Sequence, residues 1–259
     1  MMDILAGLAK SWVVFSLTVR YLLTTRRGLG TAALAATPIL LLGSLALARV
    51  ETFDIVLFQL LMVPLFLQVV VVFTTLVQAT SLIREEIEDN TMPYLLTRPI
   101  SKPAILLSKY FGYLASVLLL LVPPLLAAYA ITEAHAGDAL STDREVLIAF
   151  LVATVLATLA YGAFFTFLSV LVRRPLAVGL GIGFVWEFVV GSFPGDLPRL
   201  SIIHYLRSIL KELAPFGPLR LYTSDVSASV ASIILVAFAA AALVLAIIVF
   251  QQSEFKQKA

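Results

Sequence analysis

Six long stretches with almost no charged side chain constrain the fold of this 259-residue chain more than any other feature. A helix that spans a bilayer needs about 20 consecutive, mostly apolar residues, and each stretch is long enough. Strands of a membrane barrel have about 9–11 residues of alternating polarity, whereas these runs are continuously apolar. The sequence therefore predicts an all-α integral membrane protein with six transmembrane helices, at about residues 28–48, 55–83, 105–132, 146–172, 175–195 and 226–253.

The overall composition excludes a water-soluble fold and several kinds of site. Apolar residues make up 61% of the chain and charged residues 13%, whereas an average soluble domain is about 45–50% apolar and about 25% charged. The chain contains no cysteine, which excludes disulfides and cysteine-ligated metals. A net charge of +2 does not provide the basic face that nucleic-acid binding needs. We expect one transmembrane domain over residues 1–259, surrounded by lipid, with no metal, cofactor or nucleic acid.

Basic residues near the ends of the spans predict the orientation. Lys and Arg are about twice as frequent on the side of the N-terminus as on the opposite side. Positive charge is retained on the cytoplasmic side of a membrane. Both termini are therefore expected in the cytoplasm, as an even number of spans requires.

Residues 1–27 are expected to form an amphipathic helix on the cytoplasmic membrane surface. Four apolar residues share one helical stripe, namely Ile4, Leu8, Trp12 and Phe15. Lys10 and Arg20 lie off this stripe. A signal peptide is not expected, because Asp3 and Lys10 interrupt the apolar stretch. The alternative is that these residues extend the first span.

The last outer segment, residues 194–225, is expected to contain a second amphipathic helix. Its apolar stripe consists of Ile202, Leu206, Ile209 and Leu213. This helix would lie on the outer membrane surface or dip back toward the bundle. His204 falls in the same segment and is expected to be solvated.

Residues 83–103, between the second and third spans, contain more helix breaks than an ordinary connecting loop. Asn90 can adopt the left-handed conformation that ends a helix. Pro93 suits the first turn of a short new helix, which Pro99 ends. Ser101 can cap the third span, and Pro103 lies in its first turn. We interpret the segment as a short cytoplasmic helix, joined rigidly to two spans, that binds another protein. A solvated loop is the alternative.

The same segment resembles a known family signature. The matching residues are Glu86 through Thr91, Leu95-Leu96, Arg98-Pro99-Ile100-Ser101-Lys102, Leu106 and Lys109-Tyr110. They resemble the signature of ABC-2 type transporter permeases, in which glycine is common where this chain has Asn90. The layout is similar to that of the permease of the nitrous-oxide-reductase maturation system.

The resemblance implies a transmembrane permease subunit of an ABC exporter in the cytoplasmic membrane of a prokaryote. Two permeases would pair, and separate cytoplasmic ATPase subunits would bind ATP and Mg²⁺ beneath them. The residues implied in ATPase coupling are Glu85, Glu86, Thr91, Tyr94, Leu95, Arg98, Pro99, Lys102, Arg173 and Arg174. The chain itself contains no G-x-x-x-x-G-K-[ST] phosphate-binding motif, so we do not expect it to be an enzyme.

Polar residues inside the expected spans are candidates for a transport pathway. Gln68, Thr75 and Gln78 share one face of the second span, where they line the pathway or bond to neighbouring helices. Glu187 lies toward the outer end of the fifth span. It either lines the outer mouth of the pathway, or reaches the headgroups or pairs with Arg199 or Arg207.

Gly179 and Gly183 form a G-x-x-x-G pattern in the fifth span, suited to close packing within the chain or at a dimer contact.

Two other classes of function remain alternatives. An ion-coupled secondary transporter uses ionisable residues near the membrane midplane, and only Glu187 comes near to this requirement. A non-transporting membrane anchor or assembly subunit would pass ATPase-driven motion to a partner across the membrane. The substrate, and whether two copies or two paralogues pair, cannot be inferred from the sequence.

Overall fold

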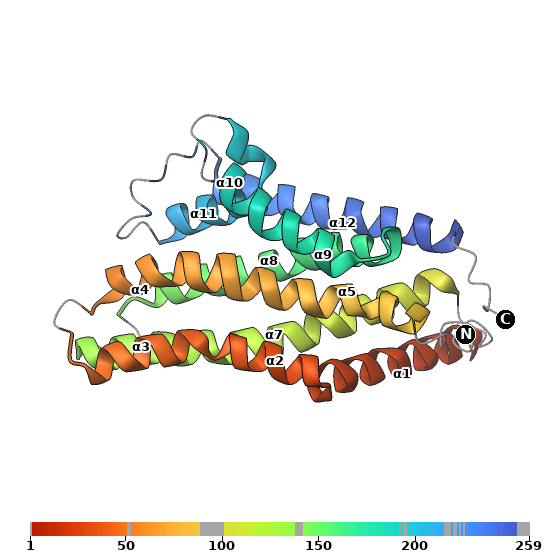
Figure 1. Cartoon of the computed structure of the whole chain (residues 1–259), viewed down its shortest axis with the longest axis horizontal. Coiled ribbons are helices and arrows are strands. Elements are labelled where there is room, and N and C mark those ends of the chain that lie inside the picture. The colour runs from red at the N-terminus through yellow and green to blue at the C-terminus, as the bar shows by residue number, and fades with distance from the viewer. Residues whose placement is uncertain are drawn as a thin grey trace.

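The computed structural model describes residues 2–50, 53–88, 101–137, 142–191, 193, 196–214, 219, 222, 224 and 226–252, with the backbone alone for 2–11, 85, 87 and 88. Every element in these ranges is helical, and the long helices lie side by side along one axis (Figure 1). Among the described residues, five helices are long and apolar enough to cross a membrane. The prediction of an all-α membrane chain is confirmed at this level.

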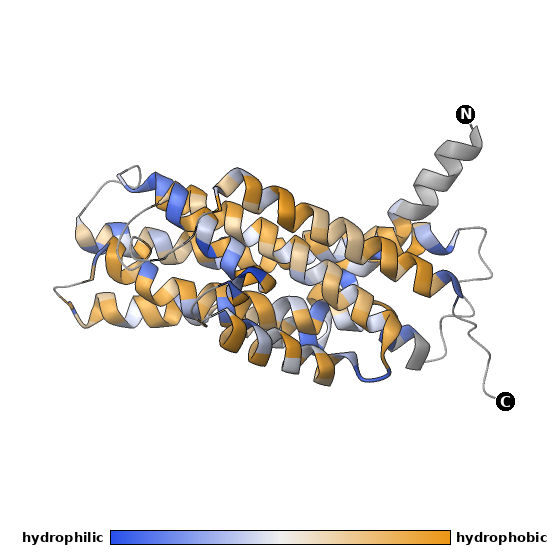
Figure 2. Cartoon of the chain, turned by 90° about the horizontal axis from the view of Figure 1, so that it is seen from above, coloured by the Kyte–Doolittle hydropathy of each residue, from blue (hydrophilic) through white to orange (hydrophobic). Residues whose placement is uncertain are grey.

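The five long helices match five of the six expected spans. They are α2–α3 (Arg26–Ala35 and Thr37–Leu47), α4–η1–α5 (Ile55–Met62, Val63–Val71 and Val72–Glu88), α7 (Lys102–Ala136), α8 (Arg144–Leu171) and α12 (Ala228–Gln252). Apolar residues predominate along these helices (Figure 2), and many large apolar side chains are exposed on them. This surface suits a lipid environment, because lipid tails are as apolar as the side chains that face them.

The fifth expected span, residues 175–195, is shorter than predicted. It forms α9 (Pro175–Leu180), the π-helical η2 (Gly181–Trp186) and α10 (Glu187–Val190), and then a turn begins at Gly191. The resulting apolar helix, Pro175–Val190, is shorter than the five spans above. The six-span arrangement therefore stays a prediction.

Local sequence signals account for where several helices begin and end. The side chain of Asp54 caps α4, with its Oδ1 atom accepting hydrogen bonds from the backbone N–H groups of Val56 (3.0 Å) and Leu57 (2.9 Å). Pro64 lies at the start of η1, where its missing N–H accompanies the change from α- to π-helix. Gly137 ends α7 in the left-handed conformation, with φ of 77°, which glycine adopts without strain.

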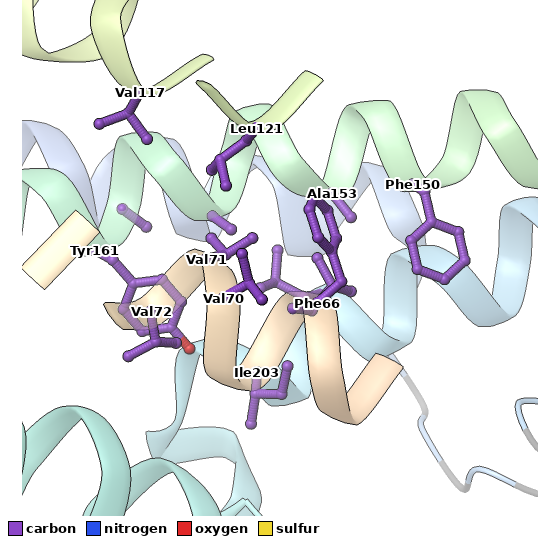
Figure 3. Packing of buried hydrophobic residues seen from close by; sticks show 14 of the residues in the cluster. Phe66, Val70, Val71, Val72, Val117, Leu121, Phe150, Ala153, Tyr161 and Ile203 are labelled. Atoms are coloured by element: carbon purple, nitrogen blue, oxygen red, sulfur yellow. The ribbon is translucent and has the colours of Figure 1, made fainter. Parts of the chain in front are cut away.

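Helix α8 forms the centre of the bundle. It packs against α5, α7, α11 (Ile202–Leu213) and α12. Figure 3 shows Phe150, Ala153 and Tyr161 of α8 among side chains of η1, α5, α7 and α11, including Phe66 and Ile203. These side chains belong to one continuous apolar cluster, so the long helices share a single core.

The G-x-x-x-G pattern faces the interior of the same chain. Gly179 lies against Leu76 of α5, and Gly183 lies against Val72 of α5 and Phe165 of α8. Pro175, Gly179, Gly183 and Glu187 are buried, whereas most residues between them are exposed. The glycines thus serve packing within the chain, which is the first of the two alternatives stated above.

Helix α1 (Met2–Thr24) packs against α7 through a different stripe from the one expected. Val14, Thr18 and Leu22 are buried, whereas Trp12 is 65% exposed. The Thr18 side chain contacts α7 beside Gly112, where the missing side chain allows the two helices to approach closely. Helix α1 therefore packs on the bundle through Val14, Thr18 and Leu22. A position of α1 on the membrane surface stays a prediction.

The segment after the fifth span folds back onto the bundle. It contains η3 (Leu197–Leu200) and α11, which packs on α8 and α12. Ile203, Leu206 and Ile209 of α11 are fully buried. Of the two expected positions for this helix, the structure has the one against the bundle.

The two ends of the bundle carry different connections (Figure 1). The beginning of α1, the end of α5, the beginning of α7, the α8–α9 turn and the end of α12 lie at one end, called here the terminal end. The α3–α4 and α7–α8 connections lie at the other end, together with α11. Both chain termini are thus on the same side, and the assignment of that side to the cytoplasm stays a prediction.

The contact between Gly162 of α8 and Tyr113 of α7 provides a test of this packing. A Cβ atom at Gly162 would overlap the Tyr113 ring, whose hydroxyl donates a hydrogen bond to the carbonyl of Thr158 at 3.1 Å. Overpacking of this kind costs about 1–3 kcal/mol. Gly162→Ala should therefore lower the free energy of unfolding in micelles by that amount. Gly181→Ala is the control, because its added Cβ meets no atom within 4 Å apart from its chain neighbours and the nearby backbone of its own helix. Equal stability of the two variants would contradict the packing described.

Candidate functional site

The segment predicted to bind an ATPase lies mostly outside the described residues. Five of its predicted contact residues fall there, namely Thr91, Tyr94, Leu95, Arg98 and Pro99. The side chain of Glu85 is also outside the described set. Their part in binding stays a prediction, whereas the two helices that flank the segment are described.

A charged pair joins the helices on either side of residues 89–100. Nζ of Lys109 in α7 forms an ion pair with Oε1 of Glu86 in α5 and donates a hydrogen bond to the carbonyl of Leu82 at 2.7 Å. The side chains of Lys109 and Glu86 are 8% and 24% exposed, respectively. Glu86, predicted to contact the ATPase, therefore bonds within its own chain.

Lys109 was not among the predicted site residues. Two features of the sequence could have suggested the pair: a lysine near the start of an apolar span, and a glutamate just before the connecting loop. That the two meet depends on how α5 and α7 pack, which hydropathy does not reveal.

Lys102, another predicted contact residue, also bonds within the chain. Its Nζ atom donates a hydrogen bond to the carbonyl of Gln251 at 3.1 Å. Gln251 lies in the last turn of α12, where backbone carbonyls lack helical partners and attract cations. Lys102 therefore ties the first turn of α7 to the last turn of α12.

Arg173 and Arg174 form an exposed basic turn at the terminal end. The turn connects α8, which ends at Leu171, to α9, which begins at Pro175. Both arginines are exposed. A proline in the first helical position needs no N–H partner and fixes the direction in which α9 starts. The turn thus presents two cations on the side of the bundle where residues 89–100 connect.

The polar residues of the second span have separate surroundings. Nε2 of Gln78 donates hydrogen bonds to Oγ1 of Thr31 at 2.8 Å and to the carbonyl of Leu22 at 3.4 Å. Thr75 donates to the carbonyl of Val72 at 2.9 Å in its own helix. Gln78 therefore has the bonds to neighbouring helices that were one of the two alternatives, whereas Thr75 bonds within its own helix.

Gln68 differs from these two residues. It is 4% exposed in η1, and its Nε2 atom has no hydrogen-bond partner within the described part of the chain. Oγ1 of Thr74 is also buried and also has no hydrogen-bond partner among the described residues. A buried polar group without a partner is costly, and Oε1 of Gln59 in the same span is unpaired in the same way. A role of Gln68 in a pathway stays a prediction.

Glu187 holds the beginning of α11. Its Oε1 atom accepts a hydrogen bond from the backbone N–H of Ile202 at 3.0 Å. Its Oε2 atom accepts bonds from the N–H of Ile203 and the hydroxyl of Tyr161, both at 2.9 Å. A carboxylate suits a helix N-terminus, where N–H groups lack partners and the helix dipole is positive.

The arginines suggested by the sequence as partners of Glu187 have other contacts. Nη1 of Arg207 donates a hydrogen bond to the carbonyl of Gly191 at 3.3 Å. Nη2 of Arg199 lies 3.2 Å from Oδ1 of Asp196. The α11 N-terminus was missed as the partner of Glu187 because the sequence does not reveal that α11 turns back to α10. A role of Glu187 in a pathway stays a prediction.

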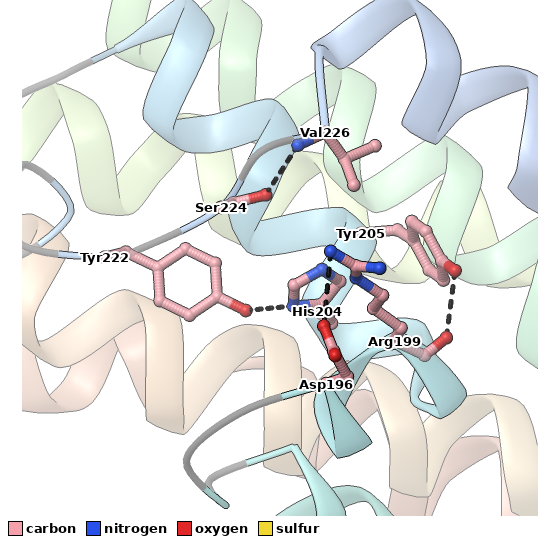
Figure 4. Close-up of polar contacts among 7 residues, drawn as sticks. All are labelled: Asp196, Arg199, His204, Tyr205, Tyr222, Ser224 and Val226. Atoms are coloured by element: carbon pink, nitrogen blue, oxygen red, sulfur yellow. Dashed lines mark hydrogen bonds and ion pairs between the residues drawn. The ribbon is translucent and has the colours of Figure 1, made fainter.

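His204 is buried, which corrects the expectation that it is solvated. It is 6% exposed, and its Nδ1 atom shares a hydrogen bond of 2.6 Å with the hydroxyl of Tyr222 (Figure 4). Burial lowers the pKa of His204, and the nearby Arg199 and Arg207 lower it further, so the imidazole is neutral at pH 7. His204 thus helps to attach the segment before α12 to α11.

The contacts of Glu187 predict a local effect of mutation. Glu187→Leu leaves two backbone N–H groups and a tyrosine hydroxyl without an acceptor, and each unsatisfied group costs about 1–3 kcal/mol. We expect faster hydrogen exchange at the amides of Ile202 and Ile203 and a lower thermal midpoint. Tyr161→Phe is the matched control, because it removes one donor and retains both backbone bonds. Unchanged exchange in Glu187→Leu would show that Glu187 does not hold α11.

Comparison with protein families adds to these observations. The family model described as ABC-2 family transporter protein matches residues 11–255. Among curated proteins no significant match is found. The match covers nearly the whole chain, including all five long apolar helices. It also includes the contacts of Lys109 and Lys102 and those of Glu187. The chain therefore belongs to the ABC-2 transporter family, as a multi-pass membrane protein of the permease type rather than an ATPase.

Proposed function

We propose that the chain is the transmembrane permease subunit of an ATP-driven ABC exporter. Two permeases pair, and separate cytoplasmic ATPase subunits that hold ATP and Mg²⁺ bind at the terminal end. The complex lies in the cytoplasmic membrane of a prokaryote with both permease termini inside. Membership in the family and the arrangement of long apolar helices support this function.

The Glu86–Lys109 pair is the observation that contributes most to the proposal. Residues 89–100 are connected at both ends to helices that this pair joins. A force applied to these residues by an ATPase would therefore reach α5 and α7 together. Lys102 extends the connection to α12 through Gln251. The exposed Arg173 and Arg174 supply a second contact for the same partner.

Three finer points belong to the same proposal. Thr91, Tyr94, Leu95, Arg98 and Pro99 form the ATPase contact, together with Glu85. Gln68 and Glu187 remain pathway candidates. The layout is that of permeases such as the one in nitrous-oxide-reductase maturation.

The proposal can be tested by purification and by two substitutions. Affinity purification of the chain from its native membrane should retain an ATP-binding subunit. Arg98→Ala and Leu95→Asp should reduce that retention or uncouple ATP hydrolysis from transport. A desolvated charged contact that loses one partner costs about 2–5 kcal/mol. Arg49→Ala is the control, because Arg49 lies in the connection from α3 to α4, which is at the opposite end of the bundle.

Two results would favour the alternative functions. Transport by the chain alone, driven by an ion gradient, would replace the proposal with a secondary transporter. ATP hydrolysis that no candidate cargo stimulates, in a complex that moves no cargo, would favour a subunit that only transmits motion.

The unequal burial of Glu86 and Lys109 gives a further prediction. Glu86→Gln leaves the charge of the more buried Lys109 without its anion, whereas Lys109→Met leaves the charge on the more exposed Glu86. Removing one partner of a buried pair costs up to about 3–5 kcal/mol. Glu86→Gln should thus lower the thermal midpoint more than Lys109→Met.

The double variant, Glu86→Gln with Lys109→Met, completes the comparison. It should recover stability relative to Glu86→Gln, while ATP hydrolysis stays poorly coupled because the link between α5 and α7 is lost. Additive effects on stability in this cycle would mean that the two residues do not interact.

A further inference from the structure

We propose that a cavity beside Glu187 binds one acyl chain of a membrane glycerophospholipid, with the phosphate of that lipid at Arg199. The cavity has a volume of about 640 Å³. It is lined by residues of α8, η2 and α12, by Glu187 of α10, and by η3 and the beginning of α11. Helix α11 lies toward the end of the bundle opposite the termini. The volume falls in the range of about 300–1,000 Å³ that is common for ligand pockets. This inference does not depend on ATP-driven transport.

The surface of the cavity is mostly hydrocarbon. Six of the apolar lining residues are Phe164, Phe165, Ile182, Ile234, Leu235 and Phe238. Phe238 is 39% exposed and Trp186, another lining residue, is 44% exposed. The cavity is therefore open at the side of the bundle, between the fifth expected span and α12, rather than enclosed in the core.

The polar groups around the cavity bond to the chain itself. Tyr161 donates to Glu187, whose oxygens also accept the two α11 backbone bonds. Nε1 of Trp186 donates to the carbonyl of Leu200 at 3.2 Å. The Tyr205 hydroxyl donates to the carbonyl of Arg199 at 2.9 Å (Figure 4). Water in a cavity needs two to four polar partners, so this arrangement favours a hydrocarbon chain over water or a polar cargo.

The depth of the cavity agrees with one leaflet of a bilayer. Ile234 and Phe238 follow the first residue of α12, Ala228, by about 9 and 15 Å at 1.5 Å per residue. A hydrocarbon core of about 30 Å gives each leaflet about 15 Å. Trp186, at the rim, is of the residue type that concentrates at membrane interfaces. A chain lying from η3 toward Phe238 would therefore run parallel to the lipids beside it.

Arg199 provides the charge that selects a phospholipid. It lies in η3 among the residues that line the cavity, and its side chain is 52% exposed. Nη2 pairs with Asp196, whose side chain is 85% exposed and remains largely in water. A guanidinium group has five N–H donors in a planar fork that fits phosphate oxygens. Arg199 can thus bind a phosphate while it keeps its contact with Asp196.

The tryptophans of the chain allow a direct test, because only Trp12 and Trp186 are present. Trp12→Phe leaves Trp186 as the only tryptophan, at the rim of the cavity. The full chain is placed in micelles of a nonionic alkyl glycoside detergent, which contain no phosphate lipid that could compete. A few mole per cent of phospholipid with brominated acyl chains is then added, and bromine quenches nearby indole fluorescence. Brominated diacylglycerol, which has the same chains and no phosphate, is the matched probe.

We expect the brominated phospholipid to quench Trp186 at much lower mole fraction than the diacylglycerol. Arg199→Gln removes a charged hydrogen-bond donor from the phosphate, so the half-quenching mole fraction should rise roughly tenfold or more. Arg199→Lys should retain part of the preference. Arg49→Gln, which removes an exposed charge elsewhere at the same end, should have no effect.

Two further measurements separate the proposed occupant from others. Ile234→Phe partly fills the cavity and should reduce quenching without lowering the thermal midpoint. Excess inorganic phosphate should not compete, because the acyl chain contributes to binding. Equal quenching by both probes, or no change in Arg199→Gln, would overturn the proposal. Quenching that disappears as the chain dimerises would also overturn it, because a second copy would then cover the cavity.

Discussion

Close packing of small residues around α8 is the constraint on which the rest of the bundle depends. Ala149, Ala153, Ala157 and Ala160 are all fully buried at intervals of three or four residues along this helix. Inside a membrane no water drives helices together, so association depends on contact area and on hydrogen bonds between helices. Small residues let backbones approach, and the large side chains of neighbouring helices then fill the remaining space. The Gly162–Tyr113 contact is one instance of this fit.

Polar bonds are concentrated where the packed bundle needs fixed connections. At the terminal end, Lys109 and Lys102 join α5, α7 and α12. At the opposite end, Glu187 and Tyr161 fix α11 against α8 and α10. Gln78 makes the corresponding link near the junction of α1 and α2. The buried links, those of Glu187, Tyr161 and Gln78, use side chains with few alternative partners in the apolar interior, which makes these connections specific.

Much of the fold could be predicted from the sequence, because hydropathy reports directly on which segments face lipid. Five spans and the amphipathic α11 followed from local patterns. The partners of Glu187, Gln78 and Lys102 could not be predicted, since each lies on another helix and depends on packing angles. The burial of His204 was missed for the same reason, because Tyr222 meets it only after α11 has turned back.

The π-helical stretch η2 has a geometric consequence for the fifth span. Four buried positions, Pro175, Gly179, Gly183 and Glu187, recur every four residues, whereas an α-helix has 3.6 residues per turn. In an uninterrupted α-helix these positions would wind progressively around the axis, and Glu187 would point away from Tyr161. A π-helical turn contains more residues than an α-helical one, so η2 unwinds the helix enough to return Glu187 to the inner face. Adding or removing one residue within η2 would therefore turn Glu187 away from the inner face. The glycine contacts and the bonds of Glu187 to α11 could then not form together.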